Sequence, residues 1–498
     1  MRALGTLDPR SLALFRILLG SLLLLDVALR FLDLRAFYTD FGVLPRSVVI
    51  ERHNPAEHFS LMMGSGAAWF QAAVLVCAAI SGACLALGYR TRIAAVAAWI
   101  LLVSIQHRNP LILQGGDVLF RIMVLFAAVL PVSRVWALDA VAGRMTTLRP
   151  SLLHFAYVAQ VACVYIITGA AKYKQAGWRE GSGLAYALWL QQYTTWLGDL
   201  LGKLPVSWLH AANHGVLAVE VLVPLLLFLP WRVPLMRMAC FAVFAAFHIA
   251  VLATLKVGLF SLISFVAWIP LLPAEFWSWL SRRAKSPSTA AVLHPMSEES
   301  CLPEQGWRAL MPNLLGAALL SFLVLWNCTN VFSSLRPTLV PPALRQAALL
   351  FGVDQSWEMF SRPISSDGWI IIPAVRADGS MADLFSGEEY SGPKRPQSLS
   401  AAFLGDRWRK YWRNLLGTGK DYQRLGLGRY FCRRSIEQDA PESRIEALQI
   451  IFMREEIQPD GSHAVPAKVL LWSHECRAGL LRKWEKKLPF SSLPYPKG

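Results

Sequence analysis

Charged residues are scarce in this chain. Only 16% of its 498 residues are Asp, Glu, Lys or Arg, whereas 55% are hydrophobic and the mean hydropathy is +0.40. Soluble globular proteins carry roughly 25% charged residues, so this composition argues against a soluble fold. We therefore expect a lipid bilayer to be the solvent for most of the chain.

The sequence also lacks the motifs of common soluble enzymes and metal sites. It has no Gly-rich phosphate loop, no Gly-x-Ser-x-Gly elbow, no paired carboxylates in a clear acid–base arrangement and no Cys-x-x-Cys. His210 and His214 have helical metal-pair spacing, but the glutamate of His-Glu-x-x-His is missing, so no metal is predicted. His248 is expected to be a satisfied interior residue. Cys432 and Cys476 lie in the polar tail, where an oxidising compartment permits a disulfide.

Nine apolar runs reach or approach the roughly 20 residues that cross a bilayer. They cover residues 11–32, 67–88, 91–106, 118–137, 151–172, 207–229, 235–255, 257–277 and 308–332. The first run is not expected to be a cleaved signal peptide, because Arg16, Asp26 and Arg30 interrupt it. The sequence predicts a mainly α fold, with a transmembrane bundle of about nine helices over residues 1–335.

The remaining residues, 340–498, predict a small extramembrane α+β domain. They have mixed charge, strand-like runs at 369–375 and 448–453, and an amphipathic helical stretch at 406–416. The Ser- and Pro-rich residues 281–303 predict a cytoplasmic linker. Basic residues at the helix ends favour a cytoplasmic amino terminus, which places the carboxy-terminal domain on the periplasmic or lumenal side. In a bacterium the membrane is then the inner membrane.

The formal charge of +16 has two interpretations. It is typical of nucleic-acid binding, but in a membrane protein it more often reflects Lys and Arg retained at the cytoplasmic ends of helices. Residues 407–434 interleave basic and aromatic residues, a mixture suited to nucleic acid or to lipid headgroups. Beside a membrane we favour lipid headgroups, so membrane lipids rather than nucleic acid are the expected partners.

Polar residues follow one face of the fifth apolar run. At 100° per residue, His154, Tyr157, Tyr165, Thr168 and Lys172 fall within an arc of about 80°. Ionisable groups are costly inside a bilayer and mark function. Two interpretations are open: Lys172 is a desolvated general base with the tyrosines near its substrate, or Lys172 reaches the interface and the tyrosines form an aromatic belt.

Charged residues also occur at helical spacing in the first and fourth runs. Asp117 and Arg121 are four residues apart, which suits an ion pair within one helix. Arg16, Asp26 and Arg30 allow the same in the first run. Because charges inside a bundle need partners whatever the function, a structural role is the simpler interpretation for each pair.

Four segments together resemble one family of membrane proteins, the HTTM family. They are SLALFRILLGSLLLLDVALR with FYTDFGVLP, then HRNPLILQGGDVLFRIMVLFAAVLP, then YIITGAAKYKQAGWREGSGLAYAL, and GVDQSWEMFSRPISSDGWIIIPAVRADGSMADLF. Asp117 and Arg121 occupy motif positions in the second, the third contains Gly-x-x-Lys, and the fourth contains Gln-x-Trp-x-Met-Phe. The segments span most of the chain.

The best understood branch of that family is the vitamin K-dependent γ-carboxylase. There, oxygenation of vitamin K hydroquinone to the epoxide generates a strong base that removes a γ proton from protein glutamate, and the carbanion captures carbon dioxide. A lysine starts the reaction by deprotonating the hydroquinone. The resemblance implies that Lys172 corresponds to that lysine, and that the cofactor is a reduced quinone such as vitamin K hydroquinone or menaquinol.

This chain also departs from the carboxylase. It has Ala171-Lys172 in place of Lys-Lys, and one extra residue separates the lysine from Trp178. The segment HRNPLIL lacks a histidine in the place of the functional one, and the large β-rich lumenal region has no counterpart in this shorter tail. These differences argue against γ-carboxylation of a peptide and leave binding or oxygenation of a quinol-like ring as the implied activity.

Two functions therefore compete. The first is a membrane enzyme that binds or oxygenates a reduced quinone, with Lys172 as base and a site lined or ordered by His154, Tyr157, Tyr165, Thr168, Asp117, Arg121 and Trp178. The second is a non-catalytic maturation or assembly factor, or a lipid-binding scaffold. Its tail contacts a client protein, and the residues that matter are Gln355, Trp357, Met359 and Phe360.

Overall fold

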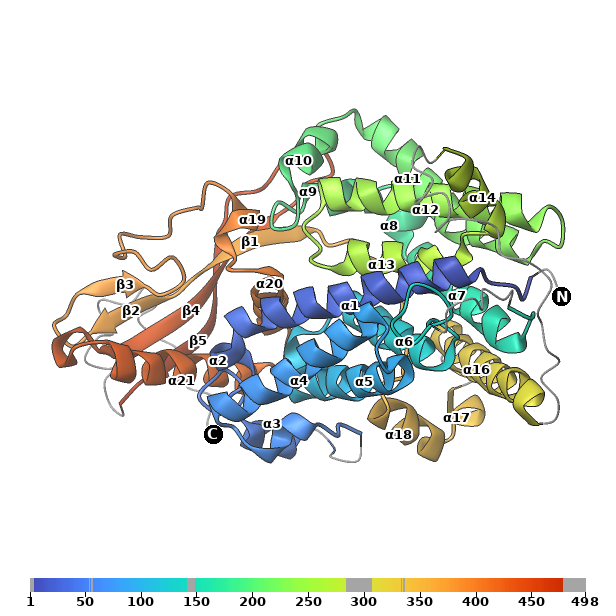
Figure 1. Ribbon diagram of the computed structural model, residues 1–498. Helices are drawn as coiled ribbons and strands as arrows, with labels where there is room; N and C mark the ends of the chain where they lie inside the picture. The colour runs from blue at the N-terminus through green and yellow to red at the C-terminus, as the bar shows by residue number, and fades with distance from the viewer. Residues whose placement is uncertain are drawn as a thin grey trace.

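A bundle of long helices and a region that holds the strands make up the computed structural model (Figure 1). The structure describes residues 4–52, 54, 57–140, 148–283, 307–332, 334 and 336–477. The predicted linker, 281–303, lies outside these residues beyond position 283.

Within the described residues, the bundle contains nine longer helical elements joined by short helices and 3₁₀ turns. The longer elements are α1 (Pro9–Leu32), α4 (Ala68–Leu87), α5 (Thr91–Arg108), α6 (Gly115–Val129), α7 (Leu152–Tyr173), α11 (Val206–Leu222), α12 (Val233–Thr254), α13 (Phe260–Trp268) with α14 (Ala274–Arg283), and α16 (Trp307–Val331). The short ones are α2 (Leu34–Phe37), α3 (Arg46–Arg52), η1 (Leu61–Gly64), η2 (Pro110–Ile112), α8 (Ala176–Arg179), α9 (Gly183–Trp189), α10 (Trp196–Gly202), η3 (Val223–Phe228), η4 (Ile269–Leu271), α17 (Arg336–Leu339) and α18 (Pro342–Leu350).

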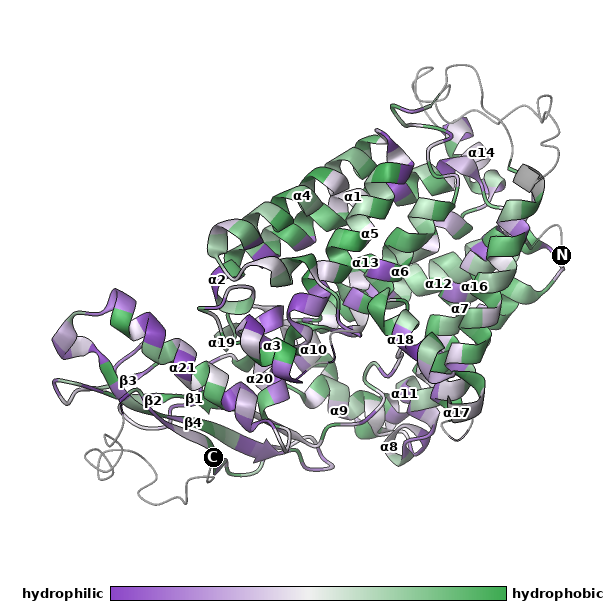
Figure 2. Cartoon of the chain, turned by 90° about the horizontal axis from the view of Figure 1, so that it is seen from below, coloured by the Kyte–Doolittle hydropathy of each residue, from purple (hydrophilic) through white to green (hydrophobic). Residues whose placement is uncertain are grey.

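The predicted membrane bundle is confirmed, since each of the nine apolar runs contains a helix. Within the part of the chain that is described, six helices are long and apolar enough to cross a membrane. A seventh crossing results if Phe260–Leu271 and Ala274–Arg283, which are bent by 95°, count as one. The 15-residue α6 ends at Val129 instead of reaching residue 137, because Pro131 follows it. Figure 2 shows hydrophobic residues covering the bundle, whereas α20 and α21 of the second region are more hydrophilic.

Small residues allow two of the membrane helices to approach closely. A Cβ atom placed on Gly20 of α1 would lie 2.5 Å from the carbonyl oxygen of Gly82 and 2.6 Å from the backbone nitrogen of Ala86, both in α4. In a bilayer, where lipid tails are as apolar as Leu, such close backbone packing is a main source of helix association. The contact therefore sets the spacing of α1 and α4.

The second region is an antiparallel sheet with helices. Its elements are β1 (Ser366–Ile371), β2 (Pro373–Arg376), β3 (Met381–Asp383), α19 (Leu399–Ala402), α20 (Asp406–Leu415), α21 (Asp421–Gln438), η6 (Pro441–Ser443), β4 (Ile445–Glu456) and β5 (Ala467–Glu475). The long β4 pairs with β1 and β2, which follow each other along one of its edges, and with β5; β3 pairs with β2. The predicted strands and the helix at 406–416 are thus confirmed.

A disulfide joins α21 to the end of the sheet. Cys432 of α21 is bonded to Cys476, which directly follows β5. On the same helix, Leu427 and Phe431 pack in one hydrophobic core with Leu448 of β4. The disulfide and this core hold α21 against the sheet.

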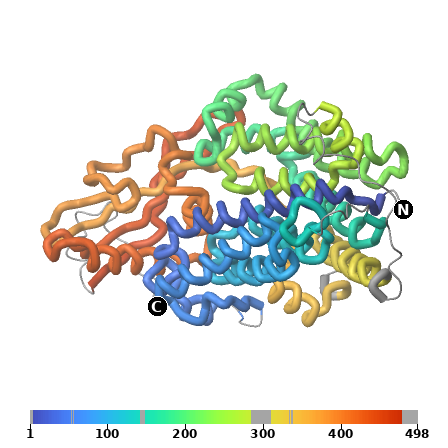
Figure 3. Tube along the Cα trace, viewed as in Figure 1, coloured from blue at the N-terminus to red at the C-terminus, as the bar shows by residue number. Residues whose placement is uncertain are grey.

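The sheet region packs on the end of the bundle farthest from the start of α1 (Figure 3). The rings of Phe37 and Trp408 are 4.5 Å apart, and Arg433 donates to the carbonyl oxygens of Phe41 and Gly42. Trp408, Tyr411 and Trp412 are buried in the protein. The prediction that residues 407–434 offer their aromatic rings to lipid headgroups is therefore wrong for these three, because they fill the contact between the two regions.

Substitution of Gly20 tests the spacing of α1 and α4. We expect Gly20→Val to lower the free energy of unfolding by about 1–3 kcal/mol, because the new side chain meets backbone rather than a movable side chain. The measurement is the thermal unfolding midpoint in detergent. Gly215→Ala is the matched control, since no atom lies within 4 Å of its added Cβ and Ala is favoured over Gly in a helix by about 0.5–1 kcal/mol. Equal midpoints for both variants would contradict the close packing.

Candidate functional site

All five polar residues predicted to share one face of α7 are buried. Two of them bond other segments and a third bonds its own helix. The Nδ1 atom of His154 lies 3.2 Å from the carbonyl oxygen of Gly5, and the Tyr157 hydroxyl donates to the carbonyl of Ala267 at 2.8 Å. Thr168 donates to the carbonyl one turn earlier in its own helix. These contacts are structural and lead away from Lys172.

Tyr165 belongs to a polar cluster between three helices. Its hydroxyl lies 2.7 Å from Nε2 of His248 in α12 and accepts a hydrogen bond of 2.9 Å from the indole of Trp268 in α13. His248 is buried, and its Nδ1 atom has no hydrogen-bond partner in the described structure. His248 thus has a partner on one nitrogen only. The cluster is suited to holding or passing a proton.

Lys172 forms a buried ion pair that its own segment does not reveal. Its ammonium group lies 2.6 Å from Oε1 of Glu220 in α11, and the two side chains are 7% and 4% exposed. The same nitrogen lies 4.7 Å from the ring centre of Trp178. The interpretation that Lys172 reaches the interface is therefore wrong. Glu220 was missed as its partner, although it is the one acidic residue of run 207–229 and so needed a partner.

The Glu220 carboxylate is only half satisfied. Its Oε2 atom is buried and has no hydrogen-bond partner among the described residues. A buried carboxylate oxygen without a donor costs about 1–3 kcal/mol or more. Such a cost is expected where a group exchanges protons or meets a substrate.

Trp178 connects this ion pair to the Gln-x-Trp-x-Met-Phe segment. Its indole donates to the carbonyl oxygen of Phe360 at 2.9 Å, and its own carbonyl accepts from Asn213 in α11 at 2.8 Å. Phe360 has a φ of +52°, which is uncommon for a bulky residue and is a form of strain found at functional sites. Two segments that lie far apart in the sequence therefore meet beside Lys172.

The other residues of that segment point into the protein. Gln355 exchanges two hydrogen bonds of 3.0 Å with Gln160 of α7 and also accepts from Trp357. Met359 packs against the backbone of Gly115 at the start of α6. The four motif residues thus attach the segment to α6, α7 and Trp178.

The predicted ion pair between Asp117 and Arg121 is wrong. Asp117 accepts from Arg30 at 2.8 Å and from Arg407 at 3.3 Å, whereas Arg121 pairs with Asp354 at 2.6 Å. Asp117 and Arg121 do lie one turn apart in the same helix, but each pairs with a side chain outside α6 instead. Arg121 of α6 binds Asp354, directly before Gln355, so it attaches the start of the motif segment to α6.

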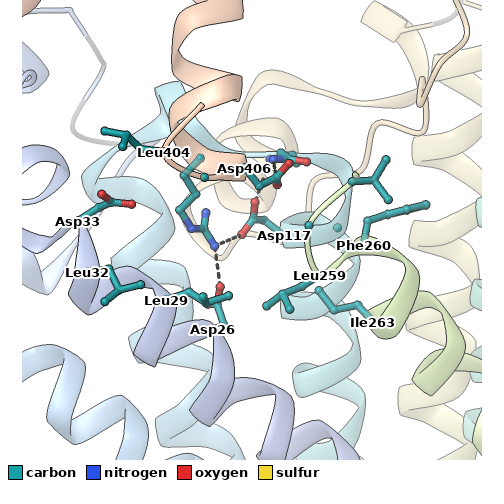
Figure 4. Close-up of a pocket in the computed structure, with 16 residues that line it drawn as sticks. Asp26, Leu29, Leu32, Asp33, Asp117, Leu259, Phe260, Ile263, Leu404 and Asp406 are labelled. Atoms are coloured by element: carbon teal, nitrogen blue, oxygen red, sulfur yellow. Dashed lines mark hydrogen bonds and ion pairs between the residues drawn. The ribbon is translucent and has the colours of Figure 1, made fainter. Parts of the chain in front are cut away.

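Asp26, Arg30, Asp117 and Arg407 form an ion cluster, of which Figure 4 shows Asp26 and Asp117. Arg30 bonds Asp26 one turn before it in α1 at 2.7 Å, as the spacing predicts, and Arg407 of α20 bonds the other oxygen of Asp26 at 2.6 Å. Two positive and two negative charges balance. Burial is tolerable only with such balance, since an unpaired charge costs several kcal/mol.

A cavity of about 120 Å³ opens beside the ion cluster. Its polar lining includes Asp26, Asp117 and Arg407, and its apolar lining includes Leu29 of α1 and Phe260 of α13. Lys172 and Glu220 do not line it. Among the described residues, His, Cys, Asp and Glu nowhere gather in groups of three that could hold a metal ion.

Comparison with models of known protein families identifies the family of the chain. The model of the HTTM domain matches residues 5–277, more than half of the chain. The match covers α1 to α14 up to Trp277 and so includes the ion pair, Trp178 and three members of the ion cluster. No curated protein and no solved structure matches the chain.

Removal of Arg407 tests the ion cluster. We expect Arg407→Met to lower the free energy of unfolding by about 3–5 kcal/mol, because Asp26 and Asp117 then share only the charge of Arg30. The variant should also expose residues 400–440 to limited proteolysis. The control is Arg434→Met, an exposed arginine of α21, for which a change within about 0.5 kcal/mol is expected. If both variants behave alike, the cluster does not hold α20 on the bundle.

Proposed function

Because the chain belongs to the HTTM domain family and is an integral membrane protein, we propose that it is a membrane-embedded enzyme related to the vitamin K-dependent γ-carboxylase. Its substrate is a reduced quinone-like lipid, which it binds and oxygenates. Lys172 is the base. The observation that carries this proposal is the buried pair of Lys172 with the half-satisfied carboxylate of Glu220.

The pair is suited to moving a proton in a site without water. Transfer of one ammonium proton from Lys172 to Glu220 leaves a neutral amine beside a neutral acid, a form that an apolar interior tolerates better than separated charges. The neutral amine of Lys172 accepts a proton from a substrate hydroxyl. Glu220 retains the displaced proton next to it. The two residues therefore act as one acid–base unit.

Neighbouring groups fit the ring and hydroxyls of a reduced quinone. The Trp178 indole beside Lys172 offers a flat face for an aromatic ring, and its bond to Phe360 fixes the plane of that face. The hydrogen-bonded Tyr165–His248 pair lies in the same bundle, with Tyr165 two turns before Lys172 in α7. When bound, the reduced quinone supplies the electrons for oxygenation, and the protein residues position it and handle its protons.

The arrangement of charges supports one orientation in the membrane. The start of α1, the turn between α4 and α5, and α14 lie at one end of the bundle (Figure 1). These elements carry Arg10, Arg90, Arg92, Arg282 and Arg283. By the positive-inside rule this side is cytoplasmic and the sheet region is outside. The disulfide between Cys432 and Cys476 agrees with an oxidising outer compartment such as the periplasm.

A second candidate is a non-catalytic maturation or assembly factor. The observation that favours it is the packing of the site: Lys172 is already paired, and Gln355 and Trp357 are buried as internal attachments. In this case the pair is structural and the sheet region contacts a client protein. Variants of Gln355, Trp357, Met359 and Phe360 then impair function, whereas loss of the Lys172 charge is silent.

A double variant distinguishes the two candidates. Lys172→Met with Glu220→Leu removes both charges together, so stability should change little, because apolar replacement of a buried pair is often neutral. If the pair is catalytic, epoxide formation should fall by about 10²–10⁴-fold, the usual contribution of a general base. The assay incubates purified protein with reduced menaquinone, ubiquinone or vitamin K under oxygen and measures the epoxide by mass spectrometry.

Two controls make the result decisive. Lys174→Met removes a nearby lysine that donates to the carbonyl of Val331, and it should keep wild-type turnover. Unfolding midpoints verify that every variant is folded. Absence of epoxide from the wild type with all three quinols would reject the enzyme proposal and favour the assembly factor.

A further inference from the structure

A hollow of about 490 Å³ lies among helix ends of the bundle. It is bordered by the turn between α4 and α5 and by the segment that follows α6. Its lining includes Arg90, Thr91, Arg92, Ser133 and Arg134. None of these residues takes part in the acid–base site or the ion cluster.

A buried arginine holds together the segments that border the hollow. Arg16 of α1 is fully buried and donates to the carbonyl oxygens of Leu85 and Ala86 in α4 and of Val132 and Trp136 after α6. It therefore ties α1 to the end of α4 and to the segment after α6, which fixes the two segments that border the hollow.

Asp139 joins the segment after α6 to the turn between α4 and α5. Its carboxylate accepts from the backbone of Arg90 at 2.8 Å and from both the backbone and the hydroxyl of Thr91 at 2.6 and 2.8 Å. The bond from the Thr91 backbone holds the pKa of Asp139 below its ordinary value. These bonds also stabilise Arg90 at a φ of +43°, which non-glycine residues rarely adopt. The one acidic side chain that lines the hollow is thus already hydrogen-bonded to donors of Arg90 and Thr91.

Three arginines remain available for a ligand. Arg90, Arg92 and Arg134 are exposed at the hollow, and within the described chain none of them forms an ion pair with a carboxylate. With Asp139 counted, the lining has an excess of two positive charges. Guanidinium groups bind phosphate oxygens by paired hydrogen bonds, so the chemistry favours a phosphate.

An apolar track leads from the hollow along the outside of the bundle. Ile93, Val96 and Ile100 of α5 are 64%, 43% and 42% exposed and follow one face of the helix at spacings of three and four residues. Leu87 and Leu138 are exposed beside the turn. A cationic hollow that continues into an exposed apolar stripe matches a molecule with an anionic head and acyl chains.

We propose that this hollow is a binding site for an anionic phospholipid. The phosphate lies among Arg90, Arg92 and Arg134, and an acyl chain runs along Ile93, Val96 and Ile100. Basic pockets beside membrane helices are known to bind acidic headgroups. The site is separate from the proposed catalytic pair, so it stands or falls independently of the enzyme proposal.

Binding is measured by titrating phosphatidylglycerol into the detergent-purified full chain, with native mass spectrometry and the unfolding midpoint as readouts. We expect one tightly held phosphatidylglycerol. Arg92→Gln with Arg134→Gln should weaken its binding about tenfold or more, since each basic group near anionic lipid contributes on the order of 1 kcal/mol. Ser133→Glu, which places a carboxylate among the arginines, should weaken it similarly.

The matched control is Arg282→Gln with Arg283→Gln, which removes the same charge from α14 at the same end of the bundle. This variant should bind phosphatidylglycerol like the wild type. Equal loss in both double variants would overturn the proposal and indicate diffuse attraction to a basic surface. Equal binding of phosphatidylcholine, or full competition by inorganic phosphate, would overturn it too, because the site would then select neither charge nor lipid.

Discussion

Arg30 lies near the end of a membrane helix with no exposed surface, and the way its charge is balanced links the two regions of the molecule. Asp26 balances it within α1 and Asp117 from α6, which leaves one negative charge in excess until Arg407 arrives from α20. An uncompensated buried charge is expensive, so the bundle is electrostatically complete only when the sheet region is docked. The excess negative charge of the membrane helices therefore favours the observed position of α20, which brings Arg407 beside Asp26 and Asp117.

The same constraint organises the interior of the bundle. Arg16 is satisfied by four backbone carbonyls, Arg121 by Asp354, and Lys172 by Glu220. Most of these partners come from other elements than the charge they balance. Each pairing thus fixes how two helices, or a helix and a loop, lie together. Among the ion pairs of the described bundle helices, the Glu220 carboxylate keeps a buried oxygen without a donor, which distinguishes the Lys172 pair from the cluster around Arg30.

The surroundings of Lys172 are assembled by the segment that follows the last membrane helix. The ring of Trp178 lies beside the ammonium group of Lys172, and its indole donates to the carbonyl oxygen of Phe360. Gln355 bonds Gln160, which lies earlier in α7 than Lys172. The Gln-x-Trp-x-Met-Phe segment therefore contributes to the surroundings of Lys172, although it lies far from the lysine in the sequence.

We could predict from the sequence alone the apolar runs, the polar face of α7 and the strands at 369–375 and 448–453, because these depend on periodicities within one segment. The sequence also indicated the ion pair of Asp26 with Arg30, because the two residues lie one helical turn apart. It did not reveal Glu220 as the partner of Lys172, the separate partners of Asp117 and Arg121, or the burial of Trp408. Those were decided by tertiary structure, because a buried charge or ring takes the best partner in space and spacing along one helix does not encode what a distant element brings beside it.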